Sequence, residues 1–394
     1  SWNHYGWPEL DTFTPSEAEA QRAYKAARED FGKVINDFNL DLYRGGEPGV
    51  CDGPAEMWPK GTKINGEDMT GKVKKLGGAT NLPNYYYLFT PKANGDGEFV
   101  FTFQQGGSST NQGEQLMRDF AGRTVQYSQS WVNPRANIVD RYQSTVTGDF
   151  CEPLVAMSPS KNARVTKNSS LNPESYANRD YRMKATIMWD YEQIMGMMSL
   201  KETGLSPYEY KNWEGPLDVY EEDGDAYKKV HYTSYNVLST TGYVFRKFIR
   251  NYAGQDRTDG VFLMYAEADN EINGPTATSV ALVNRVRHRG NLPALKADKY
   301  ADHDSFFDAI EQERIVELIG EGQRVFDLRR WRRLEKIYGG PGSTGYTWYD
   351  VFGAQENQYW VNSPSLQYQQ CYIFQIPESE RNKNPNLTQN KPWR

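Results

Sequence analysis

Residues 313–331, ERIVELIGEGQRVFDLRRW, constrain the fold of this chain more than any other segment. Apolar residues recur at helical spacing from residue 305 to residue 319. At about 100° per residue they point in nearly every direction around the helix axis. The pattern therefore predicts a helix over 305–319 that packs against neighbours on several sides.

Arg314 falls on the same stripe of this helix as the apolar residues Phe307 and Leu318, and Glu321 would join it if the helix continued. An unpaired charge buried there would destabilise the fold by several kcal/mol. We therefore expect Arg314 to pair with carboxylates such as Glu317 or Glu321, or with partners from a neighbouring helix. These charges are then structural.

Two glycines interrupt the pattern directly after this helix. Gly320 and Gly322 permit a tight turn or a close approach between helices, because glycine has no Cβ. The helical spacing then resumes, and it predicts that Val325, Phe326 and Leu328 point inward.

A second helix is predicted near the start of the chain, over residues 14–38, where apolar residues recur at three- and four-residue steps. Thr14 is a candidate N-cap, Pro15 fits the first turn, and Glu17 would complete a capping box.

Residues 259–290 predict two helices joined by a short loop at INGPT, with Gly290 as the terminator. Helix hairpins that stack on one another are typical of tetratricopeptide-like solenoids, although no clean repeat of about 34 residues is present.

The helical periodicity weakens between residues 45 and 258 and again over 339–368, where Gly, Pro, Asn, Ser and Tyr are frequent. Residues 97–103, GEFVFTF, predict a short strand, and residues 242–249 alternate imperfectly. The chain is therefore expected to combine a helical scaffold with a loop-rich half.

The amino-acid composition limits the classes of function that the chain could have. The chain of 394 residues is only 38% hydrophobic, yet it contains 27 Tyr and 10 Trp, so many rings must lie near the surface. Such rings suit recognition of sugars or peptides, and packing plugs in a loop-rich fold are the alternative. The net charge of −6 and the lack of a basic stripe argue against nucleic-acid binding. No apolar run reaches the ~18 residues of a membrane-spanning helix.

Motifs for catalysis or metal binding are incomplete. Residues 66–73 resemble a phosphate loop until Val73, where Ser or Thr is required, and residues 269–280 resemble a calcium loop until Val280, where Glu is required. The acidic stretch 220–225 fits a solvated turn. The four histidines have no metal-ligand spacing, so we predict no metal site and no cofactor, and a structural metal held by scattered carboxylates is the alternative. Three isolated cysteines, Cys51, Cys151 and Cys371, allow at most one disulfide.

Several separate motifs carry a resemblance to a known family. They are LMYAEADNEING, ALVNRVRHRGNL, FFDAIEQERIVELIGEGQRVFDLRRW and IFQIPESERNKNPNLTQN, within about residues 259–390. Together they resemble the C-terminal signature of the SusD/RagB family of nutrient-binding outer-membrane lipoproteins. NPRANIVDRYQSTVTGD and NRDYRMKATIM resemble the middle segments of that family more loosely.

The resemblance implies a mainly α, SusD-like fold, with tetratricopeptide-like helix pairs on one side and an irregular, loop-rich half with a few short strands on the other. It implies a single domain over 1–394. Its parts are a helical scaffold (14–38 and 259–335), a ligand-facing half (45–258 and 339–370) and a closing segment (371–394).

The resemblance also implies a protein that is not an enzyme. Such proteins sit on the cell surface at the outer membrane through an N-terminal lipid and cap a SusC-like TonB-dependent transporter, for which they capture oligosaccharides or peptides. The chain begins at Ser1 without a Met, a signal peptide or a lipid-acceptor Cys. We expect the anchor to precede this sequence.

The signature positions are expected to hold the scaffold rather than the ligand. They are Glu313, Arg314, Glu317, Glu321, Gly322, Arg324, Asp327, Leu328, Arg330 and Trp331, and the closing segment matches at Pro377, Asn384, Pro385, Asn386, Gln389 and Asn390.

Ligand residues vary within the family, so the candidates come from the ring-rich composition of the loop half. They are Trp131, Tyr208, Tyr210, Trp213, Tyr346, Trp348, Tyr349 and Trp360, and the alternative for each is a packed ring. We expect a carbohydrate ligand, with peptide as the alternative. Two further hypotheses are an extracellular glycosidase and an intracellular helical-repeat scaffold.

Overall fold

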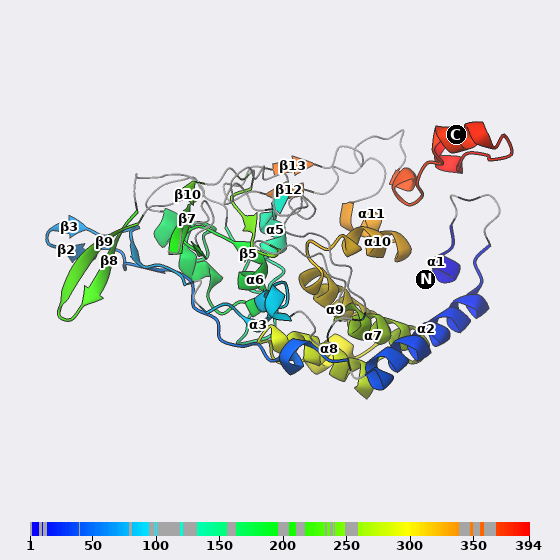
Figure 1. Cartoon of the computed structure of the whole chain (residues 1–394), viewed down its shortest axis with the longest axis horizontal. Helices are drawn as coiled ribbons and strands as arrows, with labels where there is room; N and C mark the ends of the chain where they lie inside the picture. Colours follow the sequence, from blue (N-terminus) through cyan, green and yellow to red (C-terminus); the bar gives the residue numbers. More distant parts are fainter. Residues whose placement is uncertain are drawn as a thin grey trace.

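The structure is a computed structural model. It describes residues 2–7, 10, 14–38, 40–78, 81–93, 98, 100, 119–120, 132–155, 163–195, 205–209, 217–232, 235–236, 239, 241–248, 259–338, 347–349, 355–357 and 368–394. The long helices gather in one half of the molecule and most of the short strands in the other, and both termini lie at the helical end (Figure 1). This arrangement agrees with the mainly α fold predicted from the sequence.

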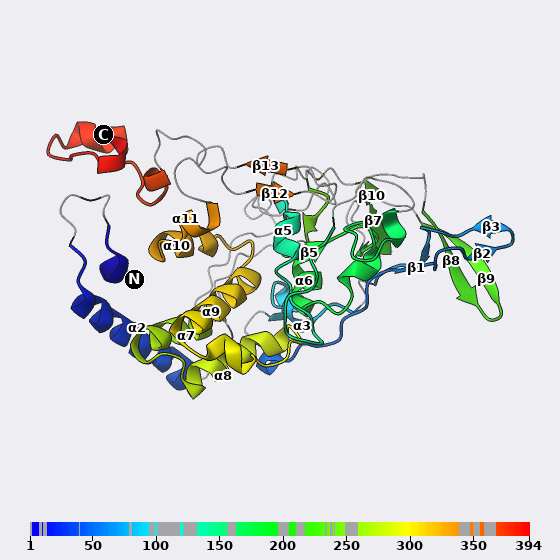
Figure 2. The same cartoon turned by 180° about the vertical axis from the view of Figure 1, so that it is seen from behind.

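Four long helices form the scaffold: α2 (Glu17–Asp37), α7 (Asp259–Asn273), α8 (Ala277–Arg289) and α9 (His303–Glu317). Helix α7 packs against α2, α8 and α9 (Figure 2). Their shared core contains Leu42, Phe262, Leu263, Ala266, Leu282, Val283, Val286, Phe306 and Ile310. Helix α9 contacts α7, α8 and α6 (Tyr181–Thr186), so the packing on several sides predicted for residues 305–319 is present.

The start of α2 differs from the prediction. Ser16, not Thr14, is the N-cap, and its hydroxyl accepts a hydrogen bond from the Glu19 amide at 3.3 Å. Glu17 is therefore the first helical residue and cannot complete a capping box from N3, where its carboxylate would have to reach back to the N-cap amide. Glu17 instead contacts His4, with 2.6 Å between Oε2 and Nδ1.

The hairpin of α7 and α8 has the predicted loop and the predicted end. Gly274 adopts a left-handed conformation with φ of 71° after α7, and Gly290 is the C-cap of α8. Thr276 caps α8 through a reciprocal box with Ser279, in which each side chain accepts from the backbone amide of the other. The acidic 269–274 segment is thus a helix terminus, as the missing calcium ligand indicated.

Helix α9 begins at His303, two residues before the predicted start, and ends at Glu317, two residues before the predicted end. Gly320 and Gly322 then both take positive φ angles, 78° and 77°, and a short helix α10 (Gln323–Arg330) follows. The predicted glycine turn is present, because only glycine adopts this backbone without strain.

Two of the three residues predicted to point inward from α10 do not. Leu328 is buried, whereas Val325 is 44% exposed and Phe326 is 57% exposed. The reason is that α10 docks on α9 through the face that contains the carboxylate of Asp327. Because this face points toward α9, Val325 and Phe326 lie on the solvent side of α10.

The remaining elements are short. The helices are α1 (Trp2–Tyr5), α3 (Asn84–Tyr87), α5 (Ala136–Val139), α6 (Tyr181–Thr186), α11 (Leu334–Tyr338) and α13 (Glu378–Lys383). Turns of 3₁₀ helix cover Tyr43–Gly46, Pro91–Ala93, Ala163–Val165, Pro173–Tyr176, Ala297–Tyr300, Tyr368–Cys371 and Lys391–Trp393.

The strands are β1 (Glu56–Met57), β2 (Lys63–Ile64), β3 (Glu67–Asp68), β4 (Val73–Lys75), β5 (Ile187–Met188), β6 (Gln193–Met195), β7 (Leu205–Glu209), β8 (Leu217–Asp223), β9 (Ala226–Tyr232), β10 (Tyr235–Asn236), β11 (Val244–Phe245), β12 (Thr347–Tyr349) and β13 (Gln355–Asn357). They pair as β1–β4, β2–β3, β5–β11, β8–β9 and β12–β13, all antiparallel, and β7 lies between antiparallel β6 and parallel β10.

The strand predicted over residues 97–103 is not present at its two described positions, because Glu98 lies in a turn and Val100 in a bend. The acidic stretch 220–225 belongs to the β8–β9 hairpin, whose turn is Gly224–Asp225 and whose Gly224 has φ of 64°. The hairpin lies at the end of the molecule opposite the termini (Figure 1).

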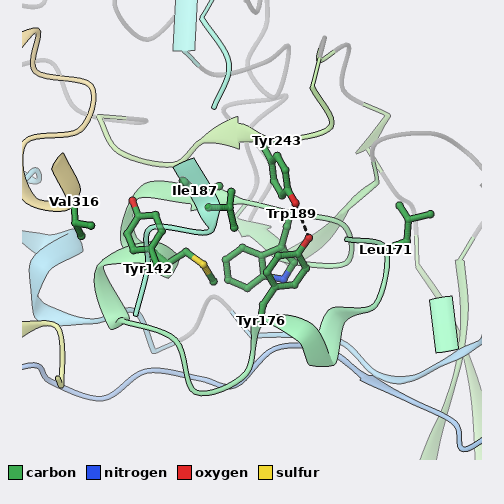
Figure 3. Packing of buried hydrophobic residues seen from close by; sticks show 9 residues of the cluster. Tyr142, Leu171, Tyr176, Ile187, Trp189, Tyr243 and Val316 are labelled. Carbon is green, nitrogen blue, oxygen red and sulfur yellow. Dashed lines mark hydrogen bonds between the residues drawn. The ribbon is translucent and has the colours of Figure 1, made fainter. Parts of the chain in front are cut away.

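Many of the described aromatic rings are buried and packed in the interior. Figure 3 shows one cluster between the loop-rich half and Val316 of α9, in which Tyr176 stacks on Trp189 with ring centroids 4.8 Å apart. The hydroxyls of Tyr176 and Tyr243 lie 2.9 Å apart, and Tyr142 reaches Thr186 at 2.6 Å. Burial of these hydroxyls is tolerated because each has a hydrogen-bond partner.

Candidate functional site

Arg314 is 3% exposed, and Asp327 of α10 is its carboxylate partner. Its Nε and Nη2 atoms donate to the two carboxylate oxygens of Asp327 at 2.8 and 3.0 Å. A partner from a neighbouring helix was one predicted alternative, and the named alternatives Glu317 and Glu321 are wrong. Glu317 instead accepts from Arg182 and Arg289, and Glu321, which lies beyond the end of the helix, accepts from Lys247.

Asp327 and Glu267 join α10 to α7 through Arg330. The Arg330 guanidinium donates to both Glu267 carboxylate oxygens and, at 2.9 Å, to Asp327. The indole nitrogen of Trp331 also donates to Glu267, at 2.9 Å. Burial alone would raise the pKa of Glu267, but Arg330, together with Arg314 and this indole, holds it below its usual value.

A second buried network joins α9 to the loop-rich half. Arg182 of α6 donates to Glu313 and Glu317 at 2.8 Å each. From α8, Arg287 donates to Glu313 at 2.6 Å, and Arg289 donates to Glu317. Each glutamate therefore has two guanidinium partners, which compensates for the desolvation of the charges.

Glu321 holds a buried lysine. The Lys247 ammonium lies 2.6 Å from Glu321 and donates to the carbonyls of Glu317 and Ile319, at 3.2 and 2.9 Å. It thus neutralises the negative end of α9 and satisfies carbonyls that lack a helical partner. Arg324, another signature residue, donates to Glu311 at 2.6 Å. The charged signature side chains are engaged by other side chains and backbone groups of the protein.

The closing segment is held by its own side chains. Gln389, a signature position, donates through Nε2 to the Ile376 carbonyl at 3.1 Å and accepts from the Ile376 amide at 3.0 Å. Asn390 donates to the Phe374 carbonyl at 2.8 Å.

Five of the eight predicted ligand-contacting rings lie outside the described residues: Trp131, Tyr210, Trp213, Tyr346 and Trp360. Two others, Trp348 and Tyr349, lie on β12, where they pair with Glu356 and Gln355 of β13. The structure therefore brings Trp348 and Tyr349 together on one short hairpin.

Tyr208 is a packed ring in this conformation. It is fully buried, and its hydroxyl donates to the Gly242 carbonyl at 3.0 Å. Tyr208 therefore fits the alternative given for each candidate, a packed ring. A ligand could not reach it unless the interior opened.

One cavity in the described part of the chain was not predicted. It has a volume of about 290 Å³ and lies between the segment 141–150, residues 294–299 and the helices α9, α10 and α11. Its polar lining includes Arg141, Gln143, Lys296, Asp308, Glu311 and Gln312. These side chains come from segments far apart in the sequence, so no local motif could have indicated the site.

Neither a metal cluster nor a membrane-spanning helix is found in the described residues. No group of three or more His, Cys, Asp or Glu side chains there is arranged to hold a metal ion. Among the same residues, no helix is both long and apolar enough to cross a bilayer. The three cysteines are free thiols.

A sequence model described as "SusD family" matches residues 97–393, about three quarters of the chain. The chain belongs to the SusD family. Two curated relatives come from Formosa agariphila: SusD-like protein P2, 28% identical over 212 residues, and SusD-like protein P25, 33% identical over 132 residues. These matches cover 52% and 33% of this chain but 38% and 22% of the relatives.

Solved SusD-like structures share the fold at low identity. A SusD-like protein from Bacteroides fragilis has a TM-score of 0.60 at 16% identity, with 95% of this chain and 62% of that chain covered. A SusD-like carbohydrate binding protein from the same species has a TM-score of 0.53 at 20% identity, with 93% and 62% covered. The chain thus spans less than two thirds of these relatives, and the likeness establishes the fold of this SusD-family chain.

Proposed function

We propose that this SusD-family chain binds oligosaccharides at the cell surface and passes them to a SusC-like TonB-dependent transporter in the outer membrane. The observation that carries the proposal is the family match over residues 97–393. One solved structure that shares this fold is described as a carbohydrate binding protein.

The ligand-binding surface in this proposal is the loop-rich half. Stacking on a pyranose face requires an accessible aromatic ring, and β12 contributes two adjacent ring-bearing residues, Trp348 and Tyr349. The remaining candidates are Trp131, Tyr210, Trp213, Tyr346 and Trp360. Tyr208 is no longer among them because it is buried.

A binding titration tests this surface. Isothermal titration against soluble glycan and peptide panels should give affinity for at least one glycan, and Tyr349→Ala should weaken that affinity about tenfold, given stacking energies of ~1–2 kcal/mol. Phe38→Ala is the matched control, since Phe38 is an exposed ring at the end of α2, in the helical scaffold. Affinity for peptides alone would replace the carbohydrate proposal with the peptide one.

We also propose that the full-length protein is lipid-anchored and does not turn its ligand over. Purification from outer membranes in detergent should recover a barrel transporter together with this protein. Recovery of the protein alone from the cytoplasm would contradict the proposal. Release of products from a bound polysaccharide, abolished by changing one carboxylate to an amide, would favour a glycosidase instead.

A further inference from the structure

The cavity beside α9 has a buried polar floor and a charged rim. Gln143 and Gln312, each 7% exposed, lie at the floor, whereas Lys296 and Lys336 at the rim have more than half of their side-chain surface exposed. A hollow of about 290 Å³ lies just below the range of ~300–1,000 Å³ for drug-sized ligands. The size fits a ligand of about one sugar ring.

The acceptor groups that line the cavity already have donors. Glu311 accepts from Arg324 at 2.6 Å and also from Arg333. Asp308 accepts from Arg333 at 2.9 Å, and Asp149 accepts from Lys296. A ligand rich in donors would find these carboxylates occupied.

Two donor groups remain available. The Oε1 atom of Gln143 accepts from Arg287 at 2.7 Å, which fixes the orientation of the amide, and its Nε2 atom has no hydrogen-bond acceptor among the described residues. The Arg141 guanidinium makes one long hydrogen bond within those residues, from Nη1 to Gln312 Oε1 at 3.3 Å. Its Nε and Nη2 atoms therefore remain free to donate.

The charge of the cavity lining also favours an anionic ligand. Six cationic side chains line the cavity in the described part of the chain, against three carboxylates, although the chain as a whole carries a net charge of −6. Free planar donors in a positive, partly enclosed site recognise a carboxylate, because arginine can donate two parallel hydrogen bonds to its oxygens.

We propose that this cavity is a second binding site, which takes a small carboxylate-bearing ligand through Arg141 and Gln143. The site goes beyond the proposed glycan-binding surface, since none of the predicted rings lines it. A sugar acid is favoured over other carboxylates because Phe150, about half exposed, places an aromatic ring at the cavity. Such a ring can stack on a pyranose face.

Isothermal titration with three probes tests the proposal on the whole chain. Sodium glucuronate should bind, glucose at the same concentration should not, and an acetylated alanine dipeptide tests the other source of a carboxylate. Arg141→Gln should weaken glucuronate binding at least tenfold, and Lys336→Gln about threefold, since the lysine acts only at the exposed rim.

Arg22→Gln is the matched control, because Arg22 is an exposed arginine on α2, far along the scaffold, and lies outside the cavity lining. It should leave binding unchanged. Lys336→Gln keeps the test valid if Arg141→Gln fails to fold, since Lys336 has only a 3.4 Å contact with Asp308.

Binding of either carboxylate through Arg141 supports the site, and the tighter probe identifies the source. The proposal is overturned by equal binding of glucose, by equal affinities of the Arg141 and Arg22 variants, or by no binding heat at roughly 10 mM probe. None of these results bears on Tyr349 or on the glycan panel, so the two proposals fail independently.

Discussion

A buried arginine is stable in this protein because its partner is placed by a turn rather than by its own helix. The chain reverses direction through Gly320 and Gly322, and this brings Asp327 of α10 against Arg314 of α9. Arg330 shares the same carboxylate. The two arginines and one aspartate therefore act together, and a substitution that removes only one of these charges leaves a buried partner uncompensated.

Replacing Asp327 should be among the most destabilising single changes in the chain. We expect Asp327→Ala to lower the free energy of unfolding by about 3–5 kcal/mol, because Arg314 would stay buried without the carboxylate that accepts its two hydrogen bonds. Urea unfolding measures the change. Asp30→Ala is the matched control, since Asp30 and Lys33 form an exposed pair that contributes at most ~1 kcal/mol.

The double variant Arg314→Met with Asp327→Asn should recover most of the stability lost in Asp327→Ala, because it removes both charges and nearly keeps the volume. Arg330 still has Glu267 as its carboxylate partner in this variant. A double variant as unstable as Asp327→Ala would show that packing, rather than charge, sets the loss.

Glu267 should make the stability sensitive to acid. Burial raises its pKa, but Arg330 and its other partners bring the folded-state value below the usual 4.5. A carboxyl group with a depressed folded-state pKa stabilises the protein fully above its unfolded pKa. That contribution is lost as the pH falls below about 4.5 and through the folded-state value.

Melting temperatures of wild type and Glu267→Gln between pH 7 and pH 3 test this effect, with the isosteric amide removing the charge. The variant should melt lower at pH 7, and the difference should shrink towards pH 3. A constant difference across the series would mean that Glu267 contributes by packing or by neutral hydrogen bonds.

At the scale of elements, the ends of the helices depend on single side chains. Thr276 caps α8, and its hydroxyl also contacts Asp269 near the end of α7. It therefore fixes both sides of the loop that joins the two helices. Thr14 lies before α2 and makes no capping hydrogen bond, because Ser16 has that role.

Thr276→Ala should destabilise the protein by about 1–2 kcal/mol, the usual effect of removing an N-cap. Thr14→Ala makes the same chemical change at an exposed position, and we expect it to shift the free energy of unfolding by less than ~0.5 kcal/mol. Equal effects of the two substitutions in urea unfolding would contradict the assigned caps.

The sequence predicted those elements whose signals are local. The apolar period of residues 305–319 and the glycines at 320 and 322 located α9 and its turn to within two residues. The partner of Arg314 depended on tertiary placement, so the named glutamates were wrong. The β8–β9 hairpin had a usable signal, a Gly-Asp pair between two seven-residue strands, that the acidic composition of residues 220–225 obscured.

The candidate site was less predictable than the fold. A ring-rich composition shows that aromatic side chains are abundant, but it does not distinguish rings on a binding surface from rings packed in the interior. Tyr208 is a ring of the packed kind. Arg141 and Gln143 lie in the segment NPRANIVDRYQSTVTGD, but nothing in the sequence marked them as binding residues, because their free donor groups depend on the partners that the fold provides. Such an arrangement becomes visible only when distant segments are brought together.

At the scale of the whole molecule, the two ends of the chain dock on one cluster. Trp7 near the N-terminus and Tyr372 in the closing segment pack with Leu328 and Leu334 of α10 and α11. Both termini lie at this end of the molecule (Figure 1). The Tyr372 hydroxyl accepts a hydrogen bond from the Leu334 amide at 3.1 Å. The guanidinium carbon of Arg332 lies over the Tyr372 ring, 3.7 Å from the ring centroid.

Tyr372→Ala should therefore release both ends together. We expect it to destabilise the protein by about 3–5 kcal/mol, as other large-to-small substitutions of buried rings do. Hydrogen exchange should accelerate in α1 and in residues 372–394 while α7, α8 and α9 keep their protection, because these helices have a separate core. Phe374→Ala, a 66% exposed ring on the same segment, is the control. Faster exchange in the closing segment alone would show that the N-terminus is held by contacts other than those of Tyr372.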